Sequence, residues 1–173
     1  MAPKLTVGVV SDTHGLVRPE ALEALRGCDV ILHAGDIGGS HVLQELAELA
    51  PVIAVRGNVD GGWARLLPER RRLDLGGVPV LILHDRVLVG PEPFLIEAEA
   101  VSGAGVTGGL GGAAQHRIVV FGHSHQPLAE KRRGVLWFNP GSAGPHRFHL
   151  PVSVGRLVIE DGRVRHRLIA LEV

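Results

Sequence analysis

Seven side chains of the types that bind divalent cations occur along this sequence, each shortly after a short apolar run. They are Asp12 and His14 in SDTHG, Asp36 in HAGD, Asn58 in RGNVD, His84 in LILHD, and His123 and His125 in FGHSH. Carboxylate and amide oxygens with imidazole nitrogens, and no thiolate, suit Mn, Fe, Co, Ni or Zn. Short apolar runs are typical of buried strands, whose ends meet at one edge of a sheet. The sequence therefore predicts a metal site assembled from separate loops.

Each residue alone also fits a structural role. Asp12 or Asp36 could be a turn residue, and Asn58 a left-handed turn residue. His84 could be a core histidine hydrogen-bonded to backbone. Together these interpretations need seven unrelated coincidences at strand ends, so the combined pattern favours one shared site.

The spacing of the residues within two of the motifs suits chelation. One residue separates Asp12 from His14, and one separates His123 from His125. Residues i and i+2 of an extended chain point to the same side, so each pair is expected to serve one site. Two divalent cations carry four positive charges, whereas two aspartates and a bridging hydroxide carry three negative charges. Such a site would attract a phosphate anion.

The predicted elements change in character midway along the chain. The first part alternates strands over 5–10, 30–33 and 52–55 with helices over 19–26 and after a capping Ser40. The second part contains predicted hairpins, pairing 72–75 with 78–83, 129–132 with 135–138 and 152–159 with 164–171, and a strand over 118–121. A helix over 92–101 and a mobile Gly-rich loop over 102–114 are predicted between these parts. Two sheets packed face to face with helices outside fit this order.

Composition excludes several classes of protein. A length of 173 residues with 45% hydrophobic residues predicts one globular domain. Basic and acidic residues number 18 each, so no basic field indicates nucleic-acid binding. Cys28 is the single cysteine, which excludes an intramolecular disulfide and a thiolate zinc site. The apolar run after MAPK is too short for a signal peptide or a membrane span, so a cytoplasmic protein without membrane contact is expected.

The motifs resemble those of the calcineurin-like metallophosphoesterase superfamily, whose pattern is D-x-H, G-D, G-N-[HCV]-[DE], a lone His and G-H-x-H. Here they stand as DTH, GD, GNVD, His84 and GHSH, and the NPGS that small members also carry is present. The resemblance covers Asp12 to Ser142 and is closest to small YfcE-type phosphodiesterases. It implies a single metallophosphoesterase domain over residues 1–173. The implied fold is a four-layer αββα sandwich of two mixed β-sheets flanked by helices.

The resemblance also implies a role for each matching residue. One divalent ion would be bound by Asp12, His14 and His125, a second by Asn58, His84 and His123, with Asp36 bridging both. A bridging hydroxide would attack phosphorus, with Asp36, Asn58 and His123 as the catalytic residues. Manganese is the expected metal, with Fe, Zn, Ni and Co as alternatives. Asp60 would orient a ligand without binding metal.

The sequence departs from the family pattern at two places. Val59 stands where many phosphomonoesterases of the superfamily carry histidine, and valine cannot donate a proton to a leaving group. This departure favours a phosphodiesterase acting on a small phosphodiester. Asp85 and Arg86 follow His84 in place of the usual Gly-His or Gly-Asp, and Arg86 could contact the substrate phosphate or lie at the surface.

Two other functions stay open at this point. One is a non-catalytic, metal-binding protein-interaction scaffold like the retromer subunit Vps29. The other is a phosphomonoesterase or dinucleoside polyphosphate hydrolase, against which Val59 argues. The physiological substrate is not encoded in the shared motifs, because recognition loops vary on a common scaffold. Edge strands of the last predicted hairpin could pair two copies of the chain into a homo-oligomer.

Overall fold

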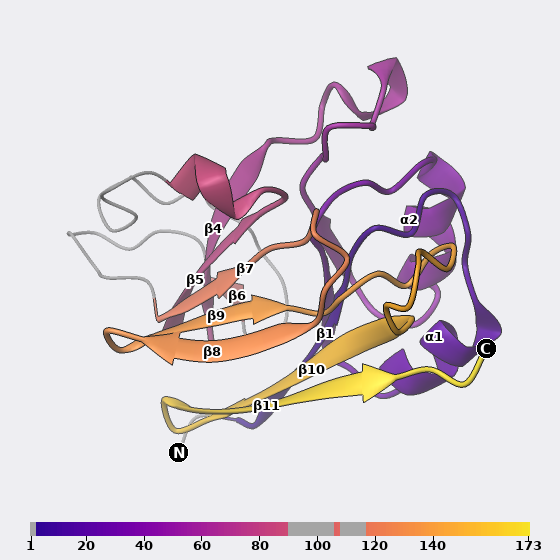
Figure 1. The fold of residues 1–173 in the computed structure, drawn as a ribbon. Coiled ribbons are helices and arrows are strands. Elements are labelled where there is room, and N and C mark those ends of the chain that lie inside the picture. Colours follow the sequence, from indigo (N-terminus) through magenta and orange to yellow (C-terminus); the bar gives the residue numbers. More distant parts are fainter. Residues whose placement is uncertain (1–2, 90–105, 108–116) are drawn as a thin grey trace.

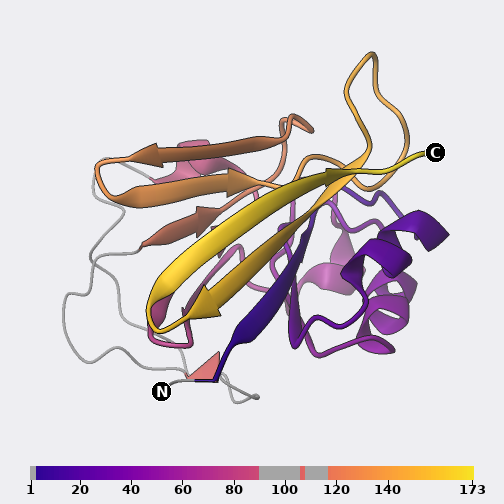
Figure 2. The ribbon, with the colours of Figure 1, turned by 90° about the horizontal axis from the view of Figure 1, so that it is seen from below.

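Two mixed β-sheets pack face to face, and helices cover the outer face of the first sheet (Figures 1 and 2). A computed structural model describes residues 3–89, 106–107 and 117–173. The arrangement confirms the predicted α/β sandwich of two mixed sheets. No helix within the described ranges is long and apolar enough to cross a membrane.

The first sheet has five strands in the order β11-β10-β1-β2-β3. Its strands are β1 (Leu5–Val10), β2 (Val30–His33), β3 (Val52–Ala54), β10 (Ser153–Glu160) and β11 (Arg163–Ala170). β1, β2 and β3 run parallel, because the crossover helices α1 (Pro19–Leu25) and α2 (Ser40–Ala47) return the chain to the same end of the sheet. β10 pairs antiparallel with both β1 and β11.

The second sheet has six strands in the order β6-β4-β5-β7-β9-β8. Its strands are β4 (Arg70–Leu75), β5 (Val78–Leu83), β6 (Val106–Thr107), β7 (Ile118–Val120), β8 (Leu128–Arg132) and β9 (Val135–Asn139). β5, β7 and β9 are parallel neighbours, whereas β4 and β8 are hairpin partners of β5 and β9. All three predicted hairpins are confirmed. Short 3₁₀ helices, η1 (Gly62–Ala64) and η2 (Arg86–Val89), follow β3 and β5.

The apolar core forms separate layers, because successive side chains of a strand point to opposite faces of its sheet. Val7 and Val9 of β1 join the apolar cluster between the two sheets, whereas Val10 joins the cluster beneath α1 and α2. Fully burying such a side chain stabilises the fold by roughly 1.5–3 kcal/mol. Gly8 lies under α1, where an added Cβ would sit 2.7 Å from Leu25 Cδ2, so glycine allows the helix to pack closely on the sheet.

Two details differ from the sequence-based predictions, and one prediction is not tested. Ser40 does not cap α2: Gly39 is the N-cap, no side chain caps the helix, and Ser40 is its first residue. Val106–Thr107 form β6 against β4, so the Gly-rich segment is not a loop throughout. The predicted helix over 92–101, and the rest of the segment over 102–114, lie outside the described residues.

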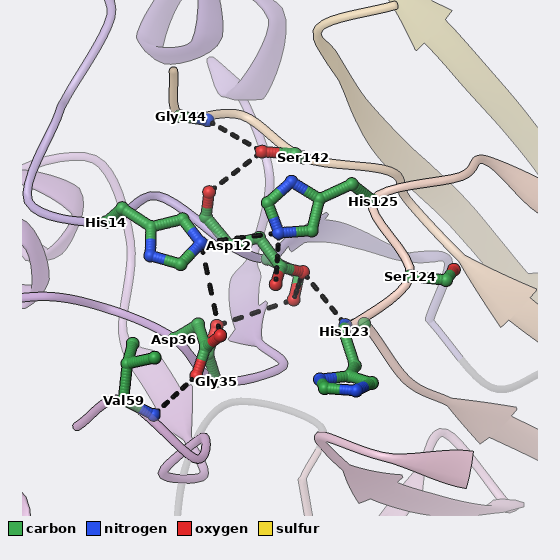
Figure 3. Close-up of polar contacts among 12 residues, drawn as sticks. Asp12, His14, Gly35, Asp36, Val59, His123, Ser124, His125, Ser142 and Gly144 are labelled. Atoms are coloured by element: carbon green, nitrogen blue, oxygen red, sulfur yellow. Dashed lines mark hydrogen bonds and ion pairs between the residues drawn. The ribbon is translucent and has the colours of Figure 1, made fainter. Parts of the chain in front are cut away.

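The loops that carry the predicted ligands follow β1, β2, β3, β5 and β7. The first three strands are parallel within one sheet, and the last two are parallel within the other. Their carboxyl ends meet at one edge of the sandwich, where the ligand side chains come together (Figure 3). Both sheets therefore contribute to the same site.

Candidate metal centre

Six of the seven predicted ligands form two compact groups. Asp12, His14 and His125 make the first group, and Asp36, His84 and His123 make the second. Within each group the potential ligand atoms all lie within 4.8 Å of one another. The seventh, Asn58, joins the second group: its Oδ1 lies 3.0 Å from His84 Nε2 and 3.1 Å from His123 Nδ1.

Asp36 lies between the two groups. Its Oδ2 is 3.2 Å from His84 Nε2 and 3.9 Å from His14 Nε2. Its other oxygen, Oδ1, accepts a hydrogen bond of 3.1 Å from the Val59 backbone N–H. The carboxylate is therefore fixed on one side and offers Oδ2 to both groups, which is the placement that a bridging ligand needs.

The first group contains a buried oxygen that suits a cation. Asp12 is fully buried, and its Oδ2 accepts hydrogen bonds from Ser11 Oγ at 2.6 Å and from the His123 N–H at 3.1 Å. Its Oδ1 receives no hydrogen bond from the described residues, although it lies 3.1 Å from His125 Nε2. His125 Nε2 in turn lies 3.3 Å from His14 Nε2. A buried carboxylate oxygen without a donor is costly unless a cation binds it.

The second group presents electron pairs in the same way. His84 Nδ1 donates to the Ala34 carbonyl at 2.7 Å, which places the ring hydrogen on Nδ1. The lone pair of Nε2 then faces Asn58 Oδ1 at 3.0 Å and His123 Nδ1 at 3.3 Å. Backbone contacts of this kind orient histidines that bind metal ions. Acceptors converge here with too few hydrogens to join them, so this group also fits a cation.

Burial and neighbouring charges shift the pKa values of three of the ligands, Asp36, His84 and His14. Burial raises the pKa of Asp36, but the His84 imidazole, whose Nε2 lies 3.2 Å from Oδ2, and the hydrogen bond from Val59 outweigh it and hold the pKa below its ordinary value. Burial lowers the pKa of His84, but the contact with Asp36 reverses this and the net pKa is raised. The pKa of His14 is lowered, chiefly by burial, against the opposing charges of Asp36 and Asp12. A cation bound here would take the place of a proton on His84.

Most of the ligands have left-handed backbone conformations. Asp12, His14, Asp36, His123 and His125 have φ of 55°, 48°, 52°, 67° and 58°. Such values are uncommon outside glycine and concentrate at functional sites. They correct the expectation of extended D-x-H and H-x-H segments. Asp12 and His14 do share one group, but His123 and His125 contribute to different groups.

Two glycines allow the ligand loops to approach each other. A Cβ added at Gly57 would overlap Asp36 Oδ1, and one added at Gly122 would overlap Ser11 Oγ. The Cβ added at Gly122 would also lie 2.6 Å from Asp12 Oδ2. Glycine is therefore needed in the G-N and G-H motifs, because any side chain there would overlap atoms at or beside the carboxylates.

Side chains of the NPGS segment support the first group (Figure 3). Ser142 Oγ donates to the Asp12 carbonyl at 2.9 Å and accepts from the Gly144 N–H at 3.3 Å. Asn139 Nδ2 donates to the Gly122 carbonyl at 2.9 Å and to Ser124 Oγ at 3.1 Å. The sequence contained this signal as a motif, but not the contacts that explain it.

Two further polar residues hold the loops in place. Asp60 accepts hydrogen bonds from the N–H groups of Ile37, Gly38 and Gly57, so it joins the loop after β2 to the loop after β3. His33 is fully buried, with Nδ1 accepting from the Gly35 N–H at 3.2 Å and Nε2 lying 2.9 Å from Thr13 Oγ1. Burial lowers the pKa of His33 to about 4.

Arg86 packs against an aromatic ring of the second sheet. Its guanidinium carbon is 5.7 Å from the centre of the Phe121 ring, and Phe121 belongs to the apolar cluster on the outer face of the second sheet. Of the two roles weighed for Arg86, the structure favours packing at the surface over contact with a phosphate.

Comparison with known proteins agrees with this arrangement. The family model for the calcineurin-like phosphoesterase superfamily domain matches residues 5–162. The chain belongs to the calcineurin-like phosphoesterase superfamily. A probable metallophosphoesterase of Methanocaldococcus jannaschii is 30% identical, across 97% of this chain and 82% of its own length. The phosphodiesterase YfcE of Escherichia coli is 32% identical, across 67% of this chain and 58% of its own length. The predicted family is confirmed.

Solved structures share the fold. An archaeal phosphodiesterase aligns with a TM-score of 0.69 and 21% identity, covering 95% of this chain and 100% of that chain. Vacuolar Protein Sorting 29 of Cryptosporidium parvum aligns with a TM-score of 0.68 and 15% identity, covering 98% and 99%. At these identities the likeness concerns the fold alone. The chain therefore has the family's domain and fold, and it carries groups of residues suited to divalent metal ions.

Proposed function

We propose that the protein is a binuclear metal-dependent phosphodiesterase that hydrolyses a small phosphodiester. The observation that supports this most is the position of Asp36 Oδ2, between two groups of converging acceptor atoms. In this proposal Asp12, His14 and His125 bind one divalent ion, Asn58, His84 and His123 bind the other, and Asp36 binds both. Residues 1–173 act as one domain.

Two divalent cations, when bound, lower the pKa of water and stabilise charge on phosphate oxygens. The chain sets the charge of the site: Asp12 and Asp36 supply two negative charges, and the amide of Asn58 supplies none. His84 would bind its ion as a neutral ligand through Nε2, since its Nδ1 hydrogen is held by the Ala34 carbonyl, and neutral imidazoles add no charge. The site keeps a net positive charge, which attracts a phosphate anion.

The preference for a diester follows from the residues around Asn58. The Val59 side chain is 53% exposed beside the ligands and has no proton to give a leaving oxygen. Hydrolysis therefore suits diesters with a stable leaving alcohol or phenol. The naming of YfcE as a phosphodiesterase supports the same substrate class.

Turnover of bis(p-nitrophenyl) phosphate with Mn²⁺ tests this proposal. The wild-type protein should release p-nitrophenol, and Asp36→Asn should lower the rate at least about a hundredfold, because it removes the shared carboxylate charge. Glu45→Gln, at an exposed position of α2, is the matched control and should retain full activity. No turnover with Mn²⁺, Fe²⁺, Co²⁺, Ni²⁺ or Zn²⁺ would reject the proposal. Preference for p-nitrophenyl phosphate would favour a monoesterase instead.

A protein-interaction scaffold is the second candidate. Val59, Trp63 and Leu66 are 53%, 41% and 91% exposed along the segment between β3 and β4, and exposed apolar residues suit a partner surface. The shared fold with Vacuolar Protein Sorting 29 is compatible with that role. A scaffold would show no diester turnover with any metal.

Three further points stay predictions. They are manganese as the native ion, a cytoplasmic location and pairing of copies through β11.

A further inference from the structure

A pocket of about 190 Å³ opens beside the second group of ligands. Three of its lining residues, Asn58, His84 and His123, belong to the second group. The others are Arg56, Gly57, Glu69, Asp85 and Leu88. A phosphate held at the ligands would place one of its ester groups beside these residues.

The charges around the pocket do not favour another phosphate. Arg56 NH2 donates to Glu69 Oε1 at 2.8 Å, so its positive charge already has a partner. Asp85 adds a second carboxylate, held by a hydrogen bond of 3.0 Å from the Val87 N–H to its Oδ1. Among the lining residues that are not metal ligands, two carboxylates therefore face one guanidinium, and this part of the pocket does not attract an additional anion.

The pocket has both the size and an apolar wall for a ring. Leu88 of η2 lines it and is 58% exposed, so its side chain is free to contact a ligand. A cavity of roughly 150 Å³ is enough to bind benzene in a protein. The Arg56–Glu69 pair offers hydrogen-bond donors and an acceptor at the same pocket.

We propose that this pocket binds one ester substituent of the substrate, and that the substituent is an uncharged ring of aryl or nucleobase type. Leu88 and the Arg56–Glu69 pair would then determine specificity. The inference rests on the proposed function, because the substrate phosphate must lie at the ligands. An uncharged substituent also excludes dinucleoside polyphosphates as substrates, because they carry further negative charge next to the reacting phosphate.

Calorimetric titration of the Mn²⁺-loaded protein with phosphate compounds tests the pocket without turnover of a diester. Phenyl phosphate should bind about tenfold more tightly than inorganic phosphate, because the ring leaves water. 4-Carboxyphenyl phosphate should lose that gain, because its carboxylate meets Glu69 and Asp85. Uridine 5′-monophosphate in a parallel titration tells a nucleobase from a simple aryl group.

Leu88→Ser should reduce the advantage of phenyl phosphate to about twofold and leave the affinity for inorganic phosphate unchanged. Leu66→Ser is the matched control, because Leu66 is 91% exposed and does not line the pocket. Equal wild-type affinities for phenyl and inorganic phosphate would overturn the pocket assignment and leave the proposed function standing. Failure of the loaded protein to bind any of these phosphates would reject both.

Discussion

The two groups of ligands differ in how far they lie from solvent. In the first group, the Asp12 and His125 side chains are 0% and 5% exposed, and His14 is 16% exposed. In the second group, His84 is 5% exposed but His123 is 48% exposed and borders the pocket. The same ligand chemistry is therefore enclosed on one side and open on the other.

Their supports differ as well. Ser11, Ser142 and the neighbouring Thr13–His33 contact hold the chain around Asp12. In the second group, His123 has a looser neighbour: its Nε2 lies 3.9 Å from Asp85 Oδ2. We therefore expect this division between the two groups: the enclosed group retains its ion, and the open group contacts the substrate.

Paired alanine variants test that division most directly. His125→Ala should weaken binding of the first ion at least about a hundredfold, because the buried Asp12 Oδ1 loses a neighbouring ligand where water enters poorly. His123→Ala should weaken the second ion only about tenfold, because solvent can replace an exposed imidazole. Calorimetric titration with Mn²⁺ measures both constants. Equal losses in the two variants would contradict the division.

The pH dependence of stability should reveal the support beneath the first group. Burial lowers the pKa of His33 from 6.5 to about 4, so between these values the unfolded chain binds a proton that the folded chain does not. The metal-free protein should therefore lose stability as pH falls from 6.5 to 4, by roughly 3 kcal/mol in total from this residue. Urea unfolding across this range measures the slope. His33→Gln should have a shallower slope, and an unchanged slope would exclude His33 as its source.

Ser142→Ala should destabilise the metal-free protein by about 2 kcal/mol, because the buried Asp12 carbonyl and Gly144 N–H lose their partner. Urea unfolding at pH 7 gives the value. Ser40→Ala is the control: Ser40 is exposed and caps nothing, so its effect should stay within about 0.5 kcal/mol. Similar losses in both variants would remove Ser142 from the support of the first group.

Asp85→Asn should have the smallest effect. Its carboxylate faces His123 Nε2 across 3.9 Å at a half-exposed site, so binding of the second ion should weaken only about threefold. Binding of the first ion should not change. Calorimetric titration distinguishes the two, and a loss confined to the first ion would contradict the assignment of Asp85 to the open side.

Much of the fold could be predicted from local sequence. Gly76-Gly77 and Asp161-Gly162 tolerate positive φ, and their hairpins form where predicted. Apolar runs also located β1 and β2 at their observed bounds. The prediction of Ser40 as the cap of α2 was wrong, because a serine in the sequence does not show whether it or the preceding Gly39 occupies the N-cap position.

The arrangement of the ligands was harder to predict. Left-handed conformations at Asp12 and His123 oppose local preference and are held by contacts between distant segments. These conformations separate His123 from His125, which an extended chain would not do. The bond from Ser142 to Asp12 joins residues 130 positions apart, so no local pattern contains it.

The pairing of β1 with β10 has a consequence for folding. β1 precedes the first ligand, yet its antiparallel neighbour comes from the final hairpin, with Leu5 opposite Ile159. Closing so long a loop costs entropy, and chains dominated by distant contacts fold slowly. During synthesis, the sheet around β1 can be completed only after β10, at residues 153–160, has been made. Capture of cations is therefore expected to be one of the last events in the maturation of this protein.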